Sequence, residues 1–501
     1  MTRTDTPAHG MSGALGERRQ RRGTSPSPNR QPTTRNPQFR PWFLLACLLL
    51  PLLVACGNPL GGRTGSASRG NGVTPTPLTD PASGSALVEQ AVAAVLDHYV
   101  DPLNSGDLFG AAYDGALETL RAAGKASGGQ AGQPAQRPSF TGDRKRDAEI
   151  FRGAYLALLG PAGAEAGQTA VAYGAIRGMV ERVDECHTSF LTPEQYAQFT
   201  AHLQGQENYG GIGVSIRGQE RPVTIGEVFR GSPAEAAGLR RGDAILAVDG
   251  TDVTGLGVDQ VGPLVRGPEG SQVRLTIRRP GEAAPRDVTI TRARITVPVF
   301  TSSIEPGPNG TKVGYMHLYS FSEGAEKELQ KALEEFERAG VTGWVLDLRD
   351  NGGGLITTLS AISSRFVKDG KPVAYAISRG EEPDPIKTDK KLFFKNQQPF
   401  AVLINEGSAS SSEAFASAAQ DYGFARLFGE TSAGCLGGAS DFPLADGSAM
   451  QITVAKVVSP QRREINRVGV KPDETVEEDG TNRAGGDPVL DAAINWLATQ
   501  R

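Results

Sequence analysis

Cysteine and long apolar runs are scarce in this chain of 501 residues, which has four cysteines, and with a net charge of −4 it has no excess of positive charge. The apolar run at residues 43–55 has only 13 residues, which is too short to span a bilayer as a mature helix. No HExxH motif, clustered ligand set or phosphate-binding loop occurs in the sequence. We therefore expect neither a metal ion nor an organic cofactor.

The N-terminal part has the pattern of an export signal. The apolar run follows Arg40 and ends in Leu53-Val54-Ala55-Cys56, the pattern of a bacterial lipobox, in which the cysteine is lipidated. We predict a signal peptide over residues 1–55 and a membrane anchor at Cys56, which places the protein at the cell envelope. The alternatives are a stop-transfer anchor, or an ordinary signal peptide followed by a chance cysteine.

Loss of the signal changes the charge and the cysteine count. Residues 1–55 carry eight arginines and two acidic residues, so the remainder has a net charge of −10. Such a charge argues against nucleic acid as a partner. Cys47 leaves with the signal, so Cys186 and Cys435 remain in an oxidising compartment where a disulfide can persist.

Composition and periodicity divide the remaining chain. Its length and its apolar fraction of 38% predict two or three packed domains. Gly, Ser, Thr, Pro and Asn dominate residues 56–85, which suits a flexible tether. Helical periodicity marks residues 86–205, interrupted by a low-complexity insertion at 124–146; strands separated by Gly and Pro turns mark residues 206–296. Strand and helix patterns then alternate over residues 297–476, and a closing helix is expected within residues 477–501.

Residues 206–296 resemble a PDZ domain. The resemblance is carried by YGGIGV at 209–214, GSPAEAAG at 231–238 and LRRGDAILAVDG at 239–250. It implies that the first motif cradles a peptide carboxylate through free backbone N–H groups, beside a strand edge that pairs with the peptide. The predicted peptide-binding residues are Tyr209, Gly210, Gly211, Ile212, Gly213 and Val214.

Three later segments resemble the C-terminal processing peptidases, also called tail-specific proteases. They are DLRDNGGG at 347–354, NEGSASSSE at 405–413 and GVKPD at 469–473. The resemblance implies a mixed α/β fold with a helical region, a PDZ domain and a crotonase-like α/β core. It also implies that Ser410 is the nucleophile and that the backbone N–H groups of Ser411 and Gly353 form the oxyanion hole. The simpler interpretation is that Ser410 caps a helix and the glycines form a turn.

The expected general base is missing. In the family a lysine follows the serine by 25 positions and a glutamine follows the lysine by four, but here these positions hold Cys435 and Ala439. His187 lies in a segment that resembles a histidine-bearing loop of the family, and its imidazole can accept a proton near neutral pH. We predict His187 as the base, with a structural role as the alternative, whereas His317 is expected to be a packed side chain.

The family resemblance also bears on the two remaining cysteines. It implies that the segments of Cys186 and Cys435 meet near one pocket, where the thiols form a disulfide or remain unpaired. A thiol protease based on Cys435 and His187 is a further alternative.

The prediction is therefore an exported serine endopeptidase that acts on proteins or peptides recognised by a free C-terminus. A catalytically silent PDZ module that binds such C-termini is the main alternative, because the family lysine and glutamine are absent. A lipoprotein scaffold is a third hypothesis, and it predicts binding that does not depend on a free carboxylate.

Overall fold

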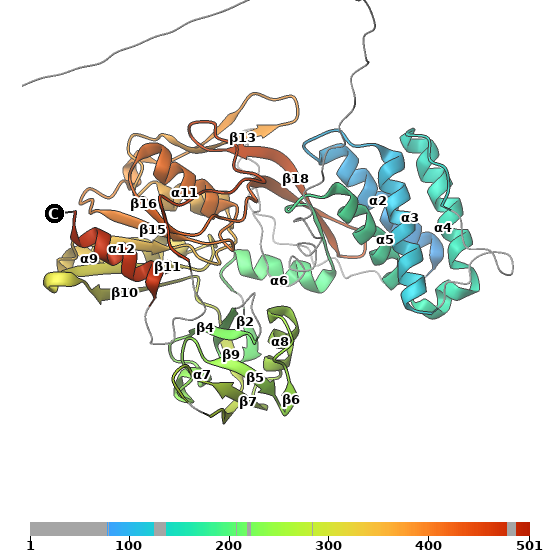
Figure 1. The fold of residues 1–501 in the computed structure, drawn as a ribbon. Coiled ribbons are helices and arrows are strands. Elements are labelled where there is room, and N and C mark those ends of the chain that lie inside the picture. Colours follow the sequence, from blue (N-terminus) through green and yellow to red (C-terminus); the bar gives the residue numbers. More distant parts are fainter. Residues whose placement is uncertain are drawn as a thin grey trace, which may run out of the picture. The chain divides into compact units, whose positions relative to one another are not determined.

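The computed structural model describes residues 78, 80–124, 137–206, 208–217, 222–282, 284–477 and 487–500. The predicted signal peptide, Cys47 and the lipidation site Cys56 lie outside these residues. Helices and strands together build a mixed α/β fold, as predicted (Figure 1). No helix in the described ranges is long and apolar enough to cross a membrane.

The described part of the N-terminal region is built from five helices. Helix α2 begins where Asp80 accepts a hydrogen bond from the Ser83 N–H and Pro81 occupies the first turn. The tether predicted to reach residue 85 therefore stops earlier, and α4 likewise begins inside the insertion predicted to reach residue 146, because Asp143 caps it. The helices are α2 Pro81–His98, α3 Ser105–Ala122, α4 Arg144–Ala166, α5 Gln168–Val183 and α6 Pro193–Leu203.

The helical region shares its apolar core with a sheet of the C-terminal part. Met450 and Ile452 of β18 are buried against residues of α2, α3 and α5, and the Val100 N–H donates to the Thr453 carbonyl. The long strand β18 extends toward these helices in Figure 1. This five-stranded sheet consists of β1 Ser189–Leu191, β13 Pro372–Ser378, β14 Asp384–Lys387, β17 Gly437–Pro443 and β18 Ala449–Val458.

The PDZ domain has an apolar core of its own, built from inward-facing residues of its strands and of α8. Its main sheet has the order β3-β4-β5-β7-β8, and β2 pairs separately with β9. The elements are β2 Asn208–Gly211, β3 Val214–Arg217, β4 Thr224–Val228, α7 Pro233–Ala236, β5 Ala244–Val248, β6 Thr251–Asp252, α8 Val258–Val265, β7 Gln272–Arg278, β8 Arg286–Thr291 and β9 Ala293–Thr296.

A six-stranded sheet forms the centre of the α/β core, in the order β10-β11-β12-β15-β16-β19. All neighbours are parallel except β10 and β11. The strands are β10 Phe300–Pro306, β11 Lys312–Leu318, β12 Gly343–Asp347, β15 Phe400–Ile404, β16 Arg426–Gly429 and β19 Glu474–Thr475. The helices are α9 Ala325–Ala339, α10 Ile356–Ser363, α11 Ser411–Tyr422 and α12 Pro488–Ala498, with 3₁₀ turns η1 Pro308–Gly310 and η2 Lys390–Leu392.

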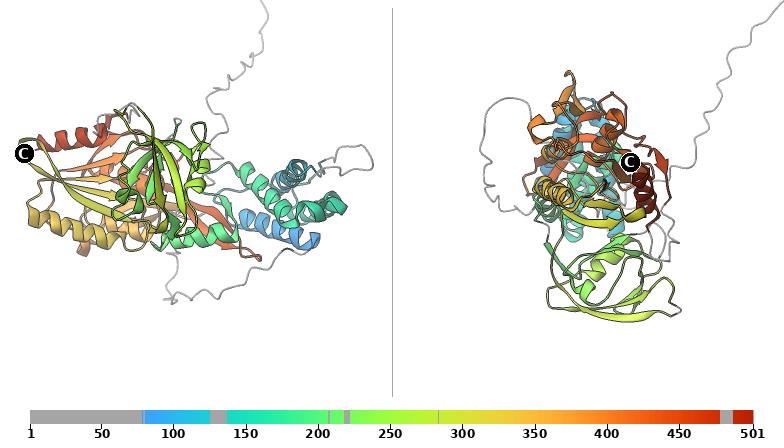
Figure 2. Two further views of the ribbon diagram at one scale, coloured as in Figure 1. Left: turned by 90° about the horizontal axis from the view of Figure 1, so that it is seen from below. Right: turned by 90° about the vertical axis from the view of Figure 1, so that its left-hand side faces the viewer.

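Both faces of this sheet are covered, which explains why its central strands are continuously apolar. Alternate side chains such as Leu346 and Val402 pack toward α9, α10 and α11, whereas Val345 and Leu403 pack toward α12. The two layers of helices are visible in Figure 2. Parallel strands end at one edge of the sheet, so the loops after β12 and β15 lie together and can form a site there.

Candidate active site

Ser410 lies at a sharp turn between β15 and α11. Its side chain is only 1% exposed, and its backbone has φ 56° and ψ −114°, a conformation that costs free energy in a residue with a Cβ. Its Oγ has no hydrogen-bond partner within the described ranges. The turn therefore holds a buried, unbonded hydroxyl at the N-terminus of a helix, a placement that suits a nucleophile.

The glycine loop after β12 packs directly against this turn. A Cβ on Gly353 would lie 2.7 Å from the Ser410 Cβ and 2.9 Å from the Ser411 nitrogen, so only glycine fits there. The Gly353 N–H donates to the Asn351 Oδ1 at 2.9 Å. The glycine loop and the serine turn are therefore in contact, and the oxyanion role of Gly353 stays a prediction, one that requires its N–H to exchange the bond to Asn351.

A buried ion-pair network anchors the start of the glycine loop. Arg349, 1% exposed, donates from Nε to Asp347 at 2.9 Å and from Nη1 and Nη2 to Asp487 at 3.0 and 2.8 Å. Asp347 also accepts a hydrogen bond from the Tyr315 hydroxyl at 2.8 Å. The arginine of the sequence motif therefore joins the end of β12 to the N-terminus of α12, and its role is structural.

Glu413 connects the serine turn with the loop that carries Cys435. Its buried carboxylate accepts hydrogen bonds from the N–H groups of Ser410 at 3.1 Å, Gly434 at 2.7 Å and Cys435 at 2.9 Å, and from the Ser432 hydroxyl at 2.6 Å. Burial raises the pKa of Glu413, although these hydrogen bonds oppose the shift. The sequence analysis assigned no role to this residue; the S-x-x-E spacing from Ser410 is the signal that pointed to it.

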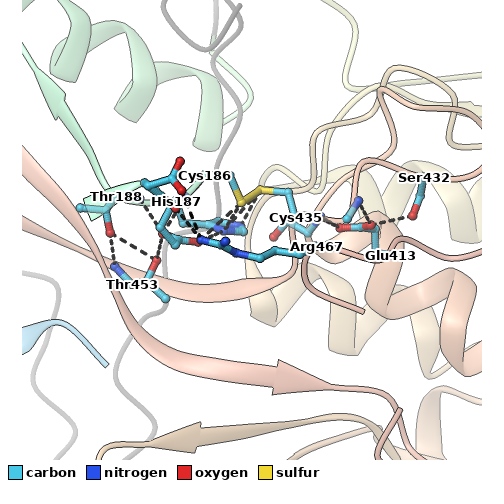
Figure 3. Close-up of a disulfide and its surroundings, with 12 residues drawn as sticks. Cys186, His187, Thr188, Glu413, Ser432, Cys435, Thr453 and Arg467 are labelled. Atoms are coloured by element: carbon cyan, nitrogen blue, oxygen red, sulfur yellow. Dashed lines mark hydrogen bonds and ion pairs between the residues drawn. A yellow bond between two sulfur atoms is a disulfide. The ribbon is translucent and has the colours of Figure 1, made fainter. Parts of the chain in front are cut away.

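A disulfide includes Cys435, the residue at the position where the family resemblance led us to expect a lysine (Figure 3). It joins Cys186 and Cys435, whose Cα atoms are 6.1 Å apart. The Ser410 N–H donates to the Cys435 carbonyl at 2.9 Å, so the disulfide is attached directly to the serine turn. In this state Cys435 has no thiol, and it can act neither as a nucleophile nor as a base.

His187 is fully buried beside the disulfide. Its Nδ1 lies 3.2 Å from the Cys186 Sγ and 3.4 Å from the Cys435 Sγ. Since the Ser410 Oγ has no partner among the described residues, the structure does not join the predicted base to the predicted nucleophile. A general base must come within hydrogen-bond reach of its proton, although such bonds often form only with substrate bound.

Glu185 holds His187 and its loop in place. One carboxylate oxygen, Oε2, accepts from the N–H groups of His187 and Thr188 at 2.9 Å each and from the Thr453 hydroxyl at 2.5 Å. The other, Oε1, lies 3.3 Å from the His187 Nδ1. Burial opposes the ionisation of Glu185, but these hydrogen bonds and the interaction with His187 outweigh it and lower the pKa to about 2. No role was predicted for Glu185, although this residue directly precedes Cys186 and His187 in the sequence.

Cys186, His187 and Cys435 also form a group of metal-ligating atoms. Their sulfur and nitrogen atoms all lie within 4.8 Å of one another. The sequence analysis expected no clustered ligand set, because 249 positions separate the two cysteines.

The predicted peptide-binding residues lie at the start of the PDZ domain. Tyr209, Gly210 and Gly211 belong to β2 and pair with β9, whereas Ile212 and Gly213 form the turn into β3. The Arg266 guanidinium lies over the Tyr209 ring, 4.4 Å from its centroid. Their role in peptide binding stays a prediction.

His317 contacts the PDZ domain. It is 6% exposed on β11, stacks on Tyr319 with 4.0 Å between ring centroids, and its Nδ1 is 3.3 Å from Glu227 of β4. It is a packed side chain, and its partner Glu227 belongs to the PDZ domain.

A buried serine on a strained turn, a glycine loop packed against it and an attached PDZ fold define the class of PDZ-bearing serine peptidases. Comparison with known proteins agrees: residues 312–476 match the profile of peptidase family S41, and residues 224–279 match that of a PDZ domain.

Individual relatives are carboxyl-terminal processing proteases. The chain is 35% identical over 306 residues to the carboxyl-terminal-processing protease of Synechocystis sp., covering 61% of this chain and 71% of the relative. It is 32% identical over 301 residues to the carboxy-terminal processing protease CtpA of Bacillus subtilis, covering 60% and 62%. A solved photosystem II D1 C-terminal processing protease aligns with a TM-score of 0.48 and 27% identity over 83% of this chain and 98% of that one. The chain belongs to peptidase family S41, the serine-type carboxyl-terminal processing peptidases.

Proposed function

We propose that this peptidase is an exported, lipid-anchored endopeptidase of the cell envelope that cleaves proteins or peptides recognised by their C-termini. The observation that carries the proposal is the Ser410 turn: a buried serine with positive φ, in contact with a glycine loop. Such strain is maintained only where the surrounding structure enforces it, and it concentrates at catalytic positions.

In this proposal Ser410 attacks the scissile carbonyl and the Ser411 N–H stabilises the oxyanion, joined by Gly353 after its loop shifts. His187 accepts the serine proton. This role requires His187 to move from its contacts with the disulfide toward the Ser410 Oγ. The substrate C-terminus enters the PDZ domain at residues 209–214, beside the open edge of β3.

Contacts between the PDZ domain and the core support a role for peptide binding in cleavage. Glu227 of β4 interacts with His317 and accepts a hydrogen bond from the Tyr319 hydroxyl. Two residues further on, the Phe321 N–H donates to the Gly353 carbonyl at 2.8 Å. A short stretch of β11 and its following loop therefore connects the strand next to the proposed peptide edge with the glycine loop.

A catalytically silent PDZ module is the second candidate function. Two observations favour it: Cys435 is held in a disulfide and carries no basic group, and the Ser410 Oγ has no hydrogen-bond partner within the described ranges. Without any base the remaining rate enhancement comes only from the oxyanion hole and binding.

Hydrolysis of an unfolded protein by the full chain, purified in detergent, separates the two candidates. The Ser410→Ala variant is expected to lose activity by about 10³-fold or more, because removing a nucleophile disables the catalytic group as a unit. The matched control is Ser417→Ala, which removes a buried hydroxyl from the same helix. Within the described ranges this hydroxyl donates to the Ala414 carbonyl. Equal background rates in wild type and Ser410→Ala, together with binding that requires a free peptide carboxylate, would establish the silent module.

A further inference from the structure

We propose that Glu185, Cys186, His187 and Cys435 bind a thiophilic divalent cation such as Zn²⁺ when the disulfide between the two cysteines is reduced. Two thiolates, an imidazole and a carboxylate are ligand types that Zn²⁺ takes in proteins. Three of these groups already lie within 4.8 Å of one another, and the fourth is adjacent in the sequence. The proposal concerns binding and does not depend on proteolytic activity.

The observed distances fit a tetrahedral ion. With bonds of about 2.3 Å to sulfur and about 2.0–2.2 Å to nitrogen or oxygen, neighbouring ligand atoms lie about 3.3–3.8 Å apart. The His187 Nδ1 is 3.2 Å from the Cys186 Sγ, 3.4 Å from the Cys435 Sγ and 3.3 Å from the Glu185 Oε1. The Glu185 Oε1 is 3.5 Å from the Cys186 Sγ. Four of the six distances between ligand atoms therefore match those of a tetrahedral site to within a few tenths of an ångström.

Two edges of the tetrahedron must still form, the one between the two sulfur atoms and the one between the Glu185 Oε1 and the Cys435 Sγ, because the group whose ligand atoms lie within 4.8 Å of one another contains Cys186, His187 and Cys435 but not Glu185. In the disulfide the sulfurs are covalently bonded and too close together to bind one ion as separate thiolates. Reduction breaks this bond, and each sulfur can then rotate about its own Cα–Cβ bond. The redox state of Cys186 and Cys435 therefore decides whether the site is complete.

Surrounding contacts orient the ligands before any ion arrives. The Glu185 Oε2 already accepts three hydrogen bonds, from His187, Thr188 and Thr453, so Oε1 is the oxygen directed at the cluster. A Cβ on Gly437 would lie 3.2 Å from the His187 Nδ1, so glycine at this position leaves that nitrogen free of crowding. Such supporting contacts are typical of metal sites.

The chemistry balances with a small dithiol as reductant. The dithiol supplies two electrons and two protons, which convert the disulfide into two thiols, and it becomes a cyclic disulfide. Zn²⁺ then displaces both thiol protons into solvent and forms two Zn–S bonds. A coordinate link between the loop of His187 and the Cys435 loop replaces the covalent one, and the Cys435 carbonyl that accepts from Ser410 stays beside the site.

Cobalt and zinc titrations of the full chain in detergent test the site. The protein is reduced with a dithiol, freed of reductant under anaerobic conditions and titrated with Co²⁺. We expect one equivalent more per chain than in the oxidised protein, with thiolate-to-cobalt charge-transfer and tetrahedral d–d absorption that Zn²⁺ abolishes. The matched control is the reduced Cys186→Ser/Cys435→Ser variant, which differs from the wild type only at these two residues. Equal binding and equal spectra in reduced wild type and this variant would overturn the proposal.

Single variants test the other two ligands and guard against a folding defect in the double variant. Glu185→Gln and His187→Ala are each expected to weaken Co²⁺ binding by about 10-fold to 100-fold or more, with far-ultraviolet circular dichroism unchanged. The exposed neighbour Asp184 supplies the control Asp184→Asn, which is expected to bind as wild type does. Spectra and affinity that do not respond to either variant would show that the cobalt is bound elsewhere.

Discussion

The two halves of the candidate site are built in different ways. The serine half, from the glycine loop to α11, is assembled from short motifs at the ends of neighbouring strands. The other half, around His187 and Cys435, is held by a disulfide between residues 249 positions apart. Local backbone geometry therefore maintains the serine turn, whereas a covalent link between distant segments holds the loop of His187.

Replacement of His187 is expected to have the largest effect on this comparison. A general base contributes about 10²-fold to 10⁴-fold to kcat/KM, so His187→Gln should lower activity by that factor. The buried histidine His317, which pairs with Glu227, supplies the control His317→Gln. Activity in His187→Gln equal to that in His317→Gln would assign His187 a structural role.

Reduction of the disulfide tests whether the second half depends on its covalent link. Opening the Cys186 to Cys435 bond, in the presence of a chelator, is expected to lower the free energy of unfolding by about 2–4 kcal/mol. Denaturant titrations with and without a dithiol measure the change. The Cys186→Ser/Cys435→Ser variant should show the lower stability under both conditions; a response of this variant to the dithiol would locate the effect elsewhere.

Acid should weaken the same half through Glu185. Its pKa is lowered from an ordinary value near 4.5 to about 2, so the folded state favours the ionised form. The resulting stabilisation is complete above pH 4.5 and is lost as the pH falls toward 2, by up to about 3 kcal/mol. The difference between the unfolding midpoints at pH 7 and pH 3 should be smaller in Glu185→Gln than in wild type. The exposed Glu194 supplies the control Glu194→Gln; an unchanged pH dependence in Glu185→Gln would contradict the assignment.

Glu413 joins the two halves, and its replacement should have the smallest of these effects. In Glu413→Gln the amide brings N–H groups against donors from Ser410, Gly434 and Cys435, so we expect a loss of about 1–3 kcal/mol in unfolding free energy. Thermal unfolding measures the loss. The control is Glu335→Gln, on the exposed face of α9. Wild-type stability in Glu413→Gln would show that the turn does not need this carboxylate.

The serine half could be anticipated closely from the sequence. The buried strand before Asn405 and the serine-rich segment after it predicted the strand-to-helix turn, and the structure places β15 at Phe400–Ile404 and α11 from Ser411. The hydrogen bond that occupies the Gly353 N–H could not be anticipated, because it depends on the rotamer of Asn351. The boundaries of the tether and the insertion were wrong by a few residues, since the caps Asp80 and Asp143 start helices that composition alone did not reveal.

The order of the PDZ and peptidase segments and the place of the serine turn could be read from the amino-acid sequence alone, because both are carried by short motifs whose physics is local. Only the tertiary structure decided that Cys186 meets Cys435, that Glu185 orients His187, and that His187 has no bond to Ser410. Contacts across some 249 positions arise from how the sheets and loops pack, and no local periodicity encodes the distance between two side chains.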